Sequence, residues 1–153
     1  MRLLFTALIA VLLSGCATSP SQPDTRSCYR ATPQEVAGLF DQWNDALKTG
    51  QPSTVVALYS EDSVLLPTLS NTPRLTAASK IDYFEHFMEK HPVGTIDERH
   101  VLTECNAAID TGLYTFTFND GSVAKARYTY TYRRDGKKWL ITSHHSSLMP
   151  ESH

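Results

Sequence analysis

The sequence predicts an α+β fold in which N-terminal helices pack on a strongly curved, mainly antiparallel sheet. Two observations support this fold class. Apolar residues recur at helical spacing up to about residue 91, and at a spacing of two from about residue 95 onward. Helices followed by a run of strands are typical of one sheet packed against a small helical layer.

The first expected helix spans residues 33–48. Thr32 is placed to cap it, Pro33 suits its first turn, and Glu35 completes a capping box with Thr32. The apolar residues that follow lie at helical spacing, and Gly50 ends the pattern.

Two more helices and a short strand are expected before residue 95. Pro52 begins a shorter helix, and residues 64–66 form a strand that ends at Pro67. Thr76 can cap a third helix, which ends at His91 because the next residue is a proline.

The second half of the folded part is expected to form four strands joined by tight turns. Asp120-Gly121 and Asp135-Gly136 are typical hairpin turns. The alternating pattern places the strands at about 96–104, 106–118, 122–133 and 138–147.

Composition excludes several classes of protein. The chain has 153 residues, of which 41% are hydrophobic and 20% are charged, as expected for one globular domain with a packed core. Its 14 basic and 16 acidic residues give a formal net charge of −2, and no block of like charge occurs. Nucleic-acid binding is therefore not expected.

Residues 1–15 are predicted to be a secretory signal peptide. Arg2 precedes an apolar run, residues 3–13, that is too short to span a bilayer. The string LSGC resembles a bacterial lipobox, which implies cleavage before Cys16 and lipidation of that residue. Acyl chains on Cys16 would anchor the protein stably without a spanning segment. By resemblance to sorted lipoproteins, we expect an outer-membrane lipoprotein of the bacterial cell envelope that faces the periplasm.

The mature chain is expected to consist of a flexible tether, residues 16–31, and a folded domain, residues 32–153. The tether is rich in Ser, Thr and Pro and has few apolar residues. Cys28 and Cys105 remain after Cys16 is lipidated, and the oxidising envelope favours a disulfide between them. Two buried free thiols are the alternative.

Four segments of the folded part carry a family resemblance, which covers about residues 33–150. They are VVALYSEDSVLLPTLSN, KIDYFEHF, GLYTFTF and RRDGKKWLITSHHSSLMP. Together with the order of elements, they resemble the association (hub) domain of calcium/calmodulin-dependent protein kinase II and its stand-alone bacterial relatives, within the NTF2-like and SnoaL-like superfamily. The resemblance implies a cone-shaped fold, assembly into a dimer or larger ring, and a ligand cavity. It does not imply kinase activity.

The resemblance also implies roles for residues on the last two strands. It directs Arg127 into the cavity, and it directs Tyr128, Tyr130 and Tyr132 outward, where a second subunit would cover them. The alternative for the tyrosines is packing against helices of the same chain. His144 shares the cavity-facing parity of Ser146.

Three further residues are candidates for the cavity. Arg74 and Arg99 could add positive charge to it, although arginines more often lie in solvent at the surface, and Tyr59 is a further candidate ligand contact. We expect no metal site, because His144 and His145 are adjacent on a strand and their side chains point to opposite faces. We expect no cofactor, since no phosphate loop or dinucleotide fingerprint occurs.

These expectations combine into one leading function and two alternatives. The leading hypothesis is a lipid-anchored homo-oligomer that binds a small polar or anionic ligand in its cavity. The first alternative is an isomerase, cyclase or dehydratase that uses His144 or a buried Asp in the same cavity as the base. The second is a structural envelope adaptor without a ligand.

Overall fold

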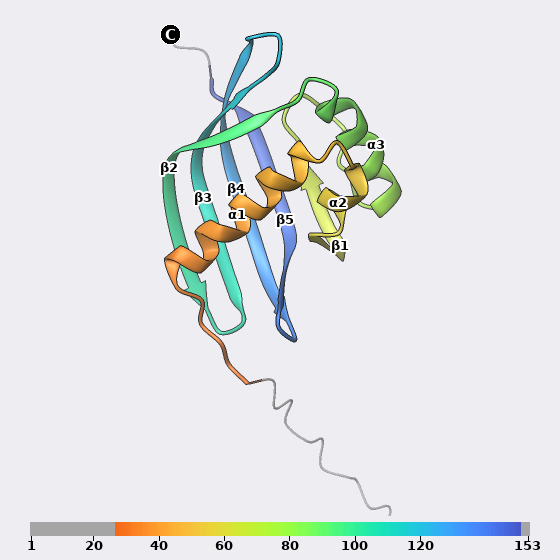
Figure 1. Ribbon diagram of the computed structural model, residues 1–153. Helices are drawn as coiled ribbons and strands as arrows, with labels where there is room; N and C mark the ends of the chain where they lie inside the picture. Colours follow the sequence, from red (N-terminus) through yellow and green to blue (C-terminus); the bar gives the residue numbers. More distant parts are fainter. Residues whose placement is uncertain (1–26, 151–153) are drawn as a thin grey trace, which may run out of the picture.

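A computed structural model describes residues 27–150 (Figure 1). Three helices and five strands follow one another along the chain. They are α1 (Pro33–Lys48), α2 (Pro52–Val56), β1 (Tyr59–Leu66), α3 (Ala77–Met88), β2 (Val93–Glu104), β3 (Ala107–Thr117), β4 (Val123–Asp135) and β5 (Lys138–Leu148). The predicted α+β class is therefore confirmed.

The five strands form one sheet in the order β1-β5-β4-β3-β2. Strands β2 to β5 are antiparallel neighbours, as their tight turns require, whereas β1 pairs with β5 in parallel. Gly121 and Gly136 adopt positive φ in the predicted hairpin turns. Strand β1 begins at Tyr59, earlier than the predicted start at residue 64, and β2 begins at Val93, earlier than the predicted start at about residue 96.

Helix α1 lies across one face of the sheet, as Figure 1 shows. Its predicted capping box is present: Glu35 N donates to Thr32 Oγ1, and Thr32 N donates to the Glu35 carboxylate. Phe40 and Trp43 are buried on its inner side. The helix thereby supplies the aromatic layer that covers the sheet.

The tyrosine stripe of β4 faces this helix, and the expectation that it points outward is wrong. The side chains of Tyr128, Tyr130 and Tyr132 are at most 3% exposed, and Tyr130 lies against both Phe40 and Trp43 of α1. Tyr128 also packs on Phe40, and Tyr132 stacks on Tyr130, so the stripe removes a large apolar area from water. The alternative expectation, packing within the same chain, is therefore correct.

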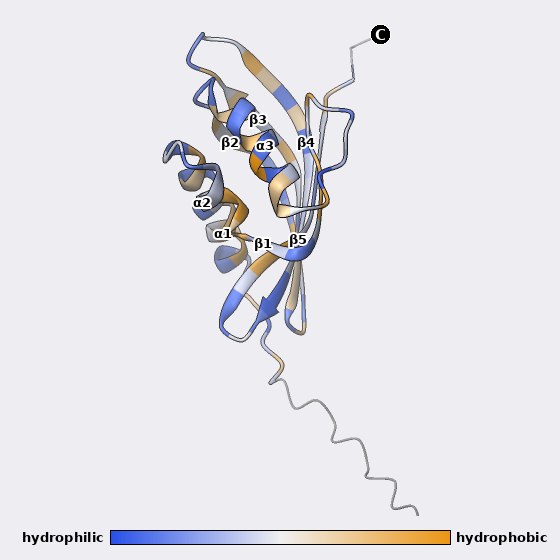
Figure 2. Cartoon of the chain, turned by 90° about the vertical axis from the view of Figure 1, so that its right-hand side faces the viewer, coloured by the Kyte–Doolittle hydropathy of each residue, from blue (hydrophilic) through white to orange (hydrophobic). Residues whose placement is uncertain are grey.

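Arg127 consequently points away from the helices, because alternate residues of a strand face opposite sides. It is exposed on the outer face of the sheet, so its predicted place inside the cavity is also wrong. In Figure 2 the three helices lie on one side of the sheet, and its other side carries no helix.

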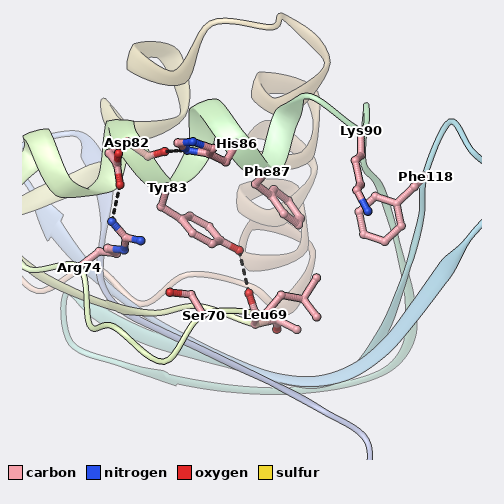
Figure 3. A pocket seen from close by; sticks show the side chains of 10 residues that line it. Leu69, Ser70, Arg74, Asp82, Tyr83, His86, Phe87, Lys90 and Phe118 are labelled. Carbon is pink, nitrogen blue, oxygen red and sulfur yellow. Dashed lines mark hydrogen bonds and ion pairs between the residues drawn. The ribbon is translucent and has the colours of Figure 1, made fainter.

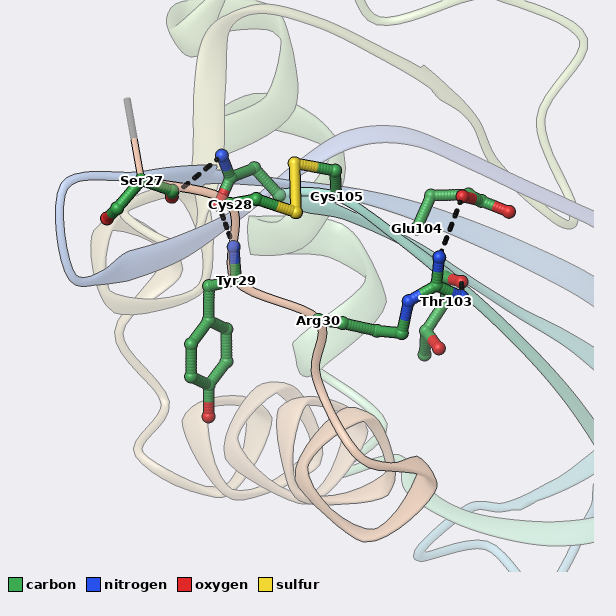
Figure 4. Close-up of a disulfide and its surroundings, with 8 residues drawn as sticks. Ser27, Cys28, Tyr29, Arg30, Thr103, Glu104 and Cys105 are labelled. Atoms are coloured by element: carbon green, nitrogen blue, oxygen red, sulfur yellow. Dashed lines mark hydrogen bonds and ion pairs between the residues drawn. A yellow bond between two sulfur atoms is a disulfide. The ribbon is translucent and has the colours of Figure 1, made fainter. Parts of the chain in front are cut away.

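The end of the predicted tether is fixed to the sheet rather than flexible. Cys28 and Cys105 form a disulfide, with their Cα atoms 5.0 Å apart (Figure 4). Tyr29 N donates to Asn106 Oδ1 at 3.0 Å, and Asn106 N donates to the Tyr29 carbonyl at 2.8 Å. Residues 27–31 thus belong structurally to the folded unit.

The predicted signal peptide, Cys16 and residues 17–26 lie outside the described residues. Among residues 27–150, no helix has the length and apolar character needed to cross a membrane.

Candidate functional site

Two adjoining cavities lie between α3 and the sheet. The outer pocket has a volume of about 390 Å³ and is lined by Thr68, Leu69, Ser70, Arg74, Asp82, Tyr83, His86, Phe87, Lys90 and Phe118 (Figure 3). The inner cavity, of about 10 Å³, is lined by Trp43, Pro67, Thr68, Tyr83, Phe84, Phe87, Tyr114, Phe116, His144 and Ser146. Thr68, Tyr83 and Phe87 line both and therefore separate them.

Three hydroxyl groups meet in the inner cavity. Tyr114 OH donates to Ser146 Oγ at 2.5 Å, and Ser146 Oγ also contacts Thr68 Oγ1. All three side chains are buried, with 1%, 6% and 5% exposed for Tyr114, Ser146 and Thr68. They come from β3, β5 and the loop after β1, so the fold brings together groups that are far apart in sequence. Such a cluster can offer hydrogen bonds to a small ligand without carrying charge.

His144 is the one titratable imidazole of the inner cavity. Burial, with a smaller contribution from the nearby charge of His145, lowers its pKa to about 3. Its Nδ1 lies 2.9 Å from Tyr59 OH, and its Nε2 has no hydrogen-bond partner among the described residues. The imidazole is therefore neutral at physiological pH.

The outer pocket combines aromatic walls with positive charge. Arg74 Nη1 pairs with Asp82 Oδ2 at 2.5 Å, and Lys90 Nζ lies 5.8 Å from the centre of the Phe118 ring. His86 donates from Nδ1 to the Asp82 carbonyl, and this hydrogen bond raises the pKa of His86. In Figure 3, Arg74 and Lys90 lie toward opposite ends of the pocket. With Arg74 paired to Asp82, Lys90 leaves the pocket lining with a net positive charge, which favours anions at the entrance of the inner cavity.

The side chain of Tyr83 stands between the two cavities. Its hydroxyl donates to the Thr68 carbonyl at 3.2 Å, as drawn in Figure 3. Leu69, the next residue, has a positive φ of 65°, which is an uncommon backbone conformation for a residue with a side chain. The loop that carries Thr68 therefore has an unusual backbone conformation beside the partition.

The structure separates the predicted site residues into four places. His144 lies in the inner cavity, and Tyr59 contacts it from behind without lining that cavity. Arg74 lies in the outer pocket. Arg127 lines a groove of about 460 Å³ on the outer face of the sheet, and Arg99 lines neither cavity.

Arg99 instead forms an ion pair with a buried carboxylate. Its Nε lies 3.2 Å from Asp110, whose carboxylate also accepts a hydrogen bond from Tyr128 OH at 2.9 Å. Burial raises the pKa of Asp110, and the contacts with Tyr128 and Arg99 oppose that rise. Asp110 is fully buried. It lines neither cavity and cannot act on a ligand in them.

Thr68 and Tyr114 are site residues that the sequence pattern did not reveal. Tyr114 could have been found from its parity in the strand GLYTFTF, because alternate residues of that strand are buried. Thr68 lies in a loop, where no periodic pattern indicates which way a side chain points. Among residues 27–150, no three His, Cys, Asp or Glu side chains are grouped as metal ligands would be.

Comparisons with known proteins agree with this architecture. Residues 32–150 match the family model of the calcium/calmodulin dependent protein kinase II association domain. A solved structure from Xanthomonas campestris, assigned to the same kind of domain, is 48% identical, covers 80% of this chain and 91% of its own, and has a TM-score of 0.76. Among curated proteins, none matches the sequence.

Two more distant structures share the fold. An NTF2-like protein of unknown function from Pseudomonas putida is 20% identical, with 77% of this chain and 87% of that chain covered and a TM-score of 0.67. The iota-carbonic anhydrase from a cyanobacterium, solved in complex with bicarbonate, is 21% identical, with 80% and 95% covered and a TM-score of 0.69. At these identities the likeness shows the fold alone.

Proposed function

The chain belongs to the calcium/calmodulin-dependent protein kinase II association domain family, with an NTF2-like fold, and from this premise we propose that its inner cavity binds bicarbonate and interconverts it with carbon dioxide. The observation that carries the proposal is the buried, uncharged cluster of hydroxyl groups, Thr68, Tyr114 and Ser146, beside a neutral His144. The cavity has room for about one water molecule, so bicarbonate, which has four non-hydrogen atoms, enters it only when Thr68 moves away from Ser146.

The chemistry of the cavity favours an oxyanion that accepts hydrogen bonds. In the hydration direction, water adds to carbon dioxide and gives bicarbonate and a proton, and negative charge develops on the oxygens of the product. Fixed hydrogen-bond donors in a site that excludes water stabilise such developing charge. The proton leaves to solvent, because no described group lining the inner cavity carries a negative charge that could retain it.

Entry to the cavity runs through the outer pocket. Arg74 and Lys90 raise the local concentration of anions there. A ligand then passes Tyr83 and inserts between Thr68 and Ser146, whose hydroxyls touch each other when nothing lies between them. The neighbour solved with bicarbonate supports the choice of this oxyanion, since the same fold holds it there.

The alternative enzyme classes receive less support from the geometry. An isomerase, cyclase or dehydratase would need a base that faces its substrate. Asp110 lies outside both cavities, and Nδ1 of His144 is engaged with Tyr59. A structural adaptor without a ligand would need no polar cluster inside its core.

Oxygen-18 exchange between carbon dioxide and water, followed by membrane-inlet mass spectrometry on the purified full-length protein, tests this function. Ser146→Ala and Tyr114→Phe each remove a hydroxyl from the cavity, and each is expected to lower the exchange rate about 10²-fold. The control Lys137→Gln, in the exposed turn between β4 and β5, keeps the wild-type rate. A wild-type rate equal to that of buffer, or equal rates in all four proteins, would refute the proposal.

We also propose that the protein acts as a lipid-anchored envelope protein that associates with copies of itself. The lipobox-like LSGC supports the anchor, and Ala17, which is not an acidic retention signal, supports the outer-membrane location facing the periplasm. Loss of acyl chains in Cys16→Ser, measured by mass spectrometry, is the expected result, and acyl chains that persist would contradict it.

Because the tyrosines of β4 are buried in the core, the outer face of the sheet, around Leu113 and Arg127, takes their place as the proposed subunit contact.

A further inference from the structure

A chain of hydrogen bonds leads from α1 to the inner cavity. Trp43 Nε1 lies 3.1 Å from Tyr59 OH, and Tyr59 OH lies 2.9 Å from His144 Nδ1. The three side chains are buried, at 1%, 7% and 3% exposed. Trp43 and Tyr59 do not belong to the cluster of hydroxyl groups formed by Thr68, Tyr114 and Ser146. Their hydrogen bonds therefore need a separate explanation.

The direction of these hydrogen bonds follows from what each group can donate. An indole N–H can only donate, so the Tyr59 oxygen accepts from Trp43. The proton of Tyr59 then has one acceptor among the contacts of that hydroxyl, His144 Nδ1. A neutral imidazole that accepts at Nδ1 carries its proton on Nε2.

The opposite arrangement leaves more polar groups unpaired. If Nδ1 carried the proton and donated to Tyr59, the Tyr59 O–H and the Nε2 lone pair would both lack partners within residues 27–150. In the first arrangement only the Nε2–H lacks one. Since each unpaired buried polar group is destabilising, the proton belongs on Nε2.

Aromatic packing holds the ring in one orientation. The imidazole stacks on Tyr130, with ring centres 4.0 Å apart and planes 23° apart, and the Trp43 ring meets it edge-on at 5.4 Å. These contacts leave Nε2 as the remaining polar atom of a side chain that lines the inner cavity.

We propose that Trp43 and Tyr59 are positioning residues that fix His144 as its Nε2–H tautomer, so that His144 gives the inner cavity a hydrogen-bond donor and not a base. The ligand part of this inference rests on the proposed function, but the tautomer does not. With Nε2–H and the hydroxyls directed at it, the cavity selects a ligand whose oxygens accept hydrogen bonds, such as bicarbonate, over an amine or ammonium ion.

Nitrogen-15 NMR of the imidazole groups, recorded on the ligand-free full-length protein at neutral pH, reads the tautomer directly. The wild type is expected to show His144 with protonated Nε2 and unprotonated Nδ1. Tyr59→Phe removes the only hydroxyl that donates to Nδ1, so it is expected to give a mixture of both tautomers. Tyr132→Phe is the matched control: it removes a buried hydroxyl that has no partner among the described residues, and the wild-type tautomer should remain.

Two outcomes would overturn the positioning role: a wild-type His144 protonated at Nδ1, or an unchanged Nε2–H tautomer in Tyr59→Phe. If Tyr59→Phe fails to fold, the wild-type spectrum alone still shows whether His144 is protonated at Nδ1 or at Nε2, and protonation at Nδ1 would overturn the positioning role. Sodium bicarbonate is then added to the wild type, and a shift of the His144 Nε2–H resonance is expected. If the tautomer is as proposed but the resonance does not move, the positioning role stands, whereas the ligand and the proposed function both fail.

Discussion

At the scale of single residues, the inner cavity depends on a histidine that the fold keeps neutral. His144 is 3% exposed and is surrounded by aromatic rings. Burial disfavours the charged imidazolium, which is why the pKa of His144 falls to about 3 from its ordinary value of 6.5. The same effect couples the stability of the protein to pH.

The free energy of unfolding should fall as the pH is lowered through the window between these two pKa values. The unfolded chain binds a proton at His144 below about pH 6.5, whereas the folded chain does so only near pH 3. Stability from this group is complete above pH 6.5 and is lost toward pH 3. Between pH 6 and pH 4 the expected loss is about 2–3 kcal/mol.

Urea unfolding of the wild type and His144→Gln at several pH values measures this contribution. The variant should lose less stability than the wild type over the same range, by about the amount just given. Replacing the exposed His100 by glutamine is the control for a histidine substitution outside the core. Parallel pH profiles for His144→Gln and the wild type would contradict a buried, neutral imidazole.

At the scale of secondary-structure elements, the bend of β2 along β3 depends on one glycine. The pairing of the two strands shifts register between Ile96 and Glu98, and Gly112 pairs with the next residue of β2, Arg99. A Cβ atom at Gly112 would overlap the carbonyl oxygen of Glu98. The backbones approach each other closely at this point, so only a residue without a side chain fits.

Replacing two glycines by alanine should therefore change stability in opposite directions. Gly112→Ala forces the strands apart and is expected to lower the free energy of unfolding by about 1–3 kcal/mol. Gly38→Ala, in α1, meets no atom within 4 Å and should raise that free energy by about 0.5–1 kcal/mol. Urea midpoints of the two variants give the comparison, and effects of the same sign would exclude the close strand contact.

The elements also show which features the sequence could predict. Local signals, such as Thr32 with Glu35 and the Asp-Gly turns, identify α1 and the hairpins because each depends on neighbouring residues. Alternation in β4 separates Arg127 from Tyr128, but it does not state which face is covered. That choice depends on α1, whose aromatic residues pack on the tyrosines.

The candidate site was predictable only in part for a related reason. His144 was identified from its parity with Ser146 on β5, and both are buried. The contacts of Ser146 with Tyr114 and Thr68 join residues 32 and 78 positions apart. They depend on strand register and on the path of a loop, neither of which is encoded in a local pattern.

At the scale of the whole molecule, the helices α1 to α3 cover one face of the sheet, and we propose that a second copy of the chain covers the other. Apolar and charged side chains are mixed on that outer face. Three adjacent strands, β2, β3 and β4, contribute to it Leu102, Ile109, Leu113 and Arg127. A second copy of the chain can pair such a face with itself, because Glu98 and Arg127 both line the groove there and offer opposite charges.

Light scattering at micromolar concentration should find a dimer or larger assembly for the wild type. Leu113→Asp places a charge at the centre of the outer face and is expected to give a smaller species. Leu75→Asp changes a leucine that is 57% exposed and lies outside the sheet, so it should leave the assembly intact. A monomeric wild type, or equal effects of the two substitutions, would contradict association through this face.

Binding of bicarbonate in the inner cavity is tested most directly by a crystal structure of the protein soaked with bicarbonate. The expected result is planar density within hydrogen-bonding distance of Tyr114 OH, Ser146 Oγ and His144 Nε2, with Thr68 Oγ1 and Ser146 Oγ moved apart. The same soak of Ser146→Ala should leave that position without the anion. Density confined to the outer pocket beside Arg74 or Lys90, or an inner cavity unchanged by the soak, would contradict binding of bicarbonate in the inner cavity.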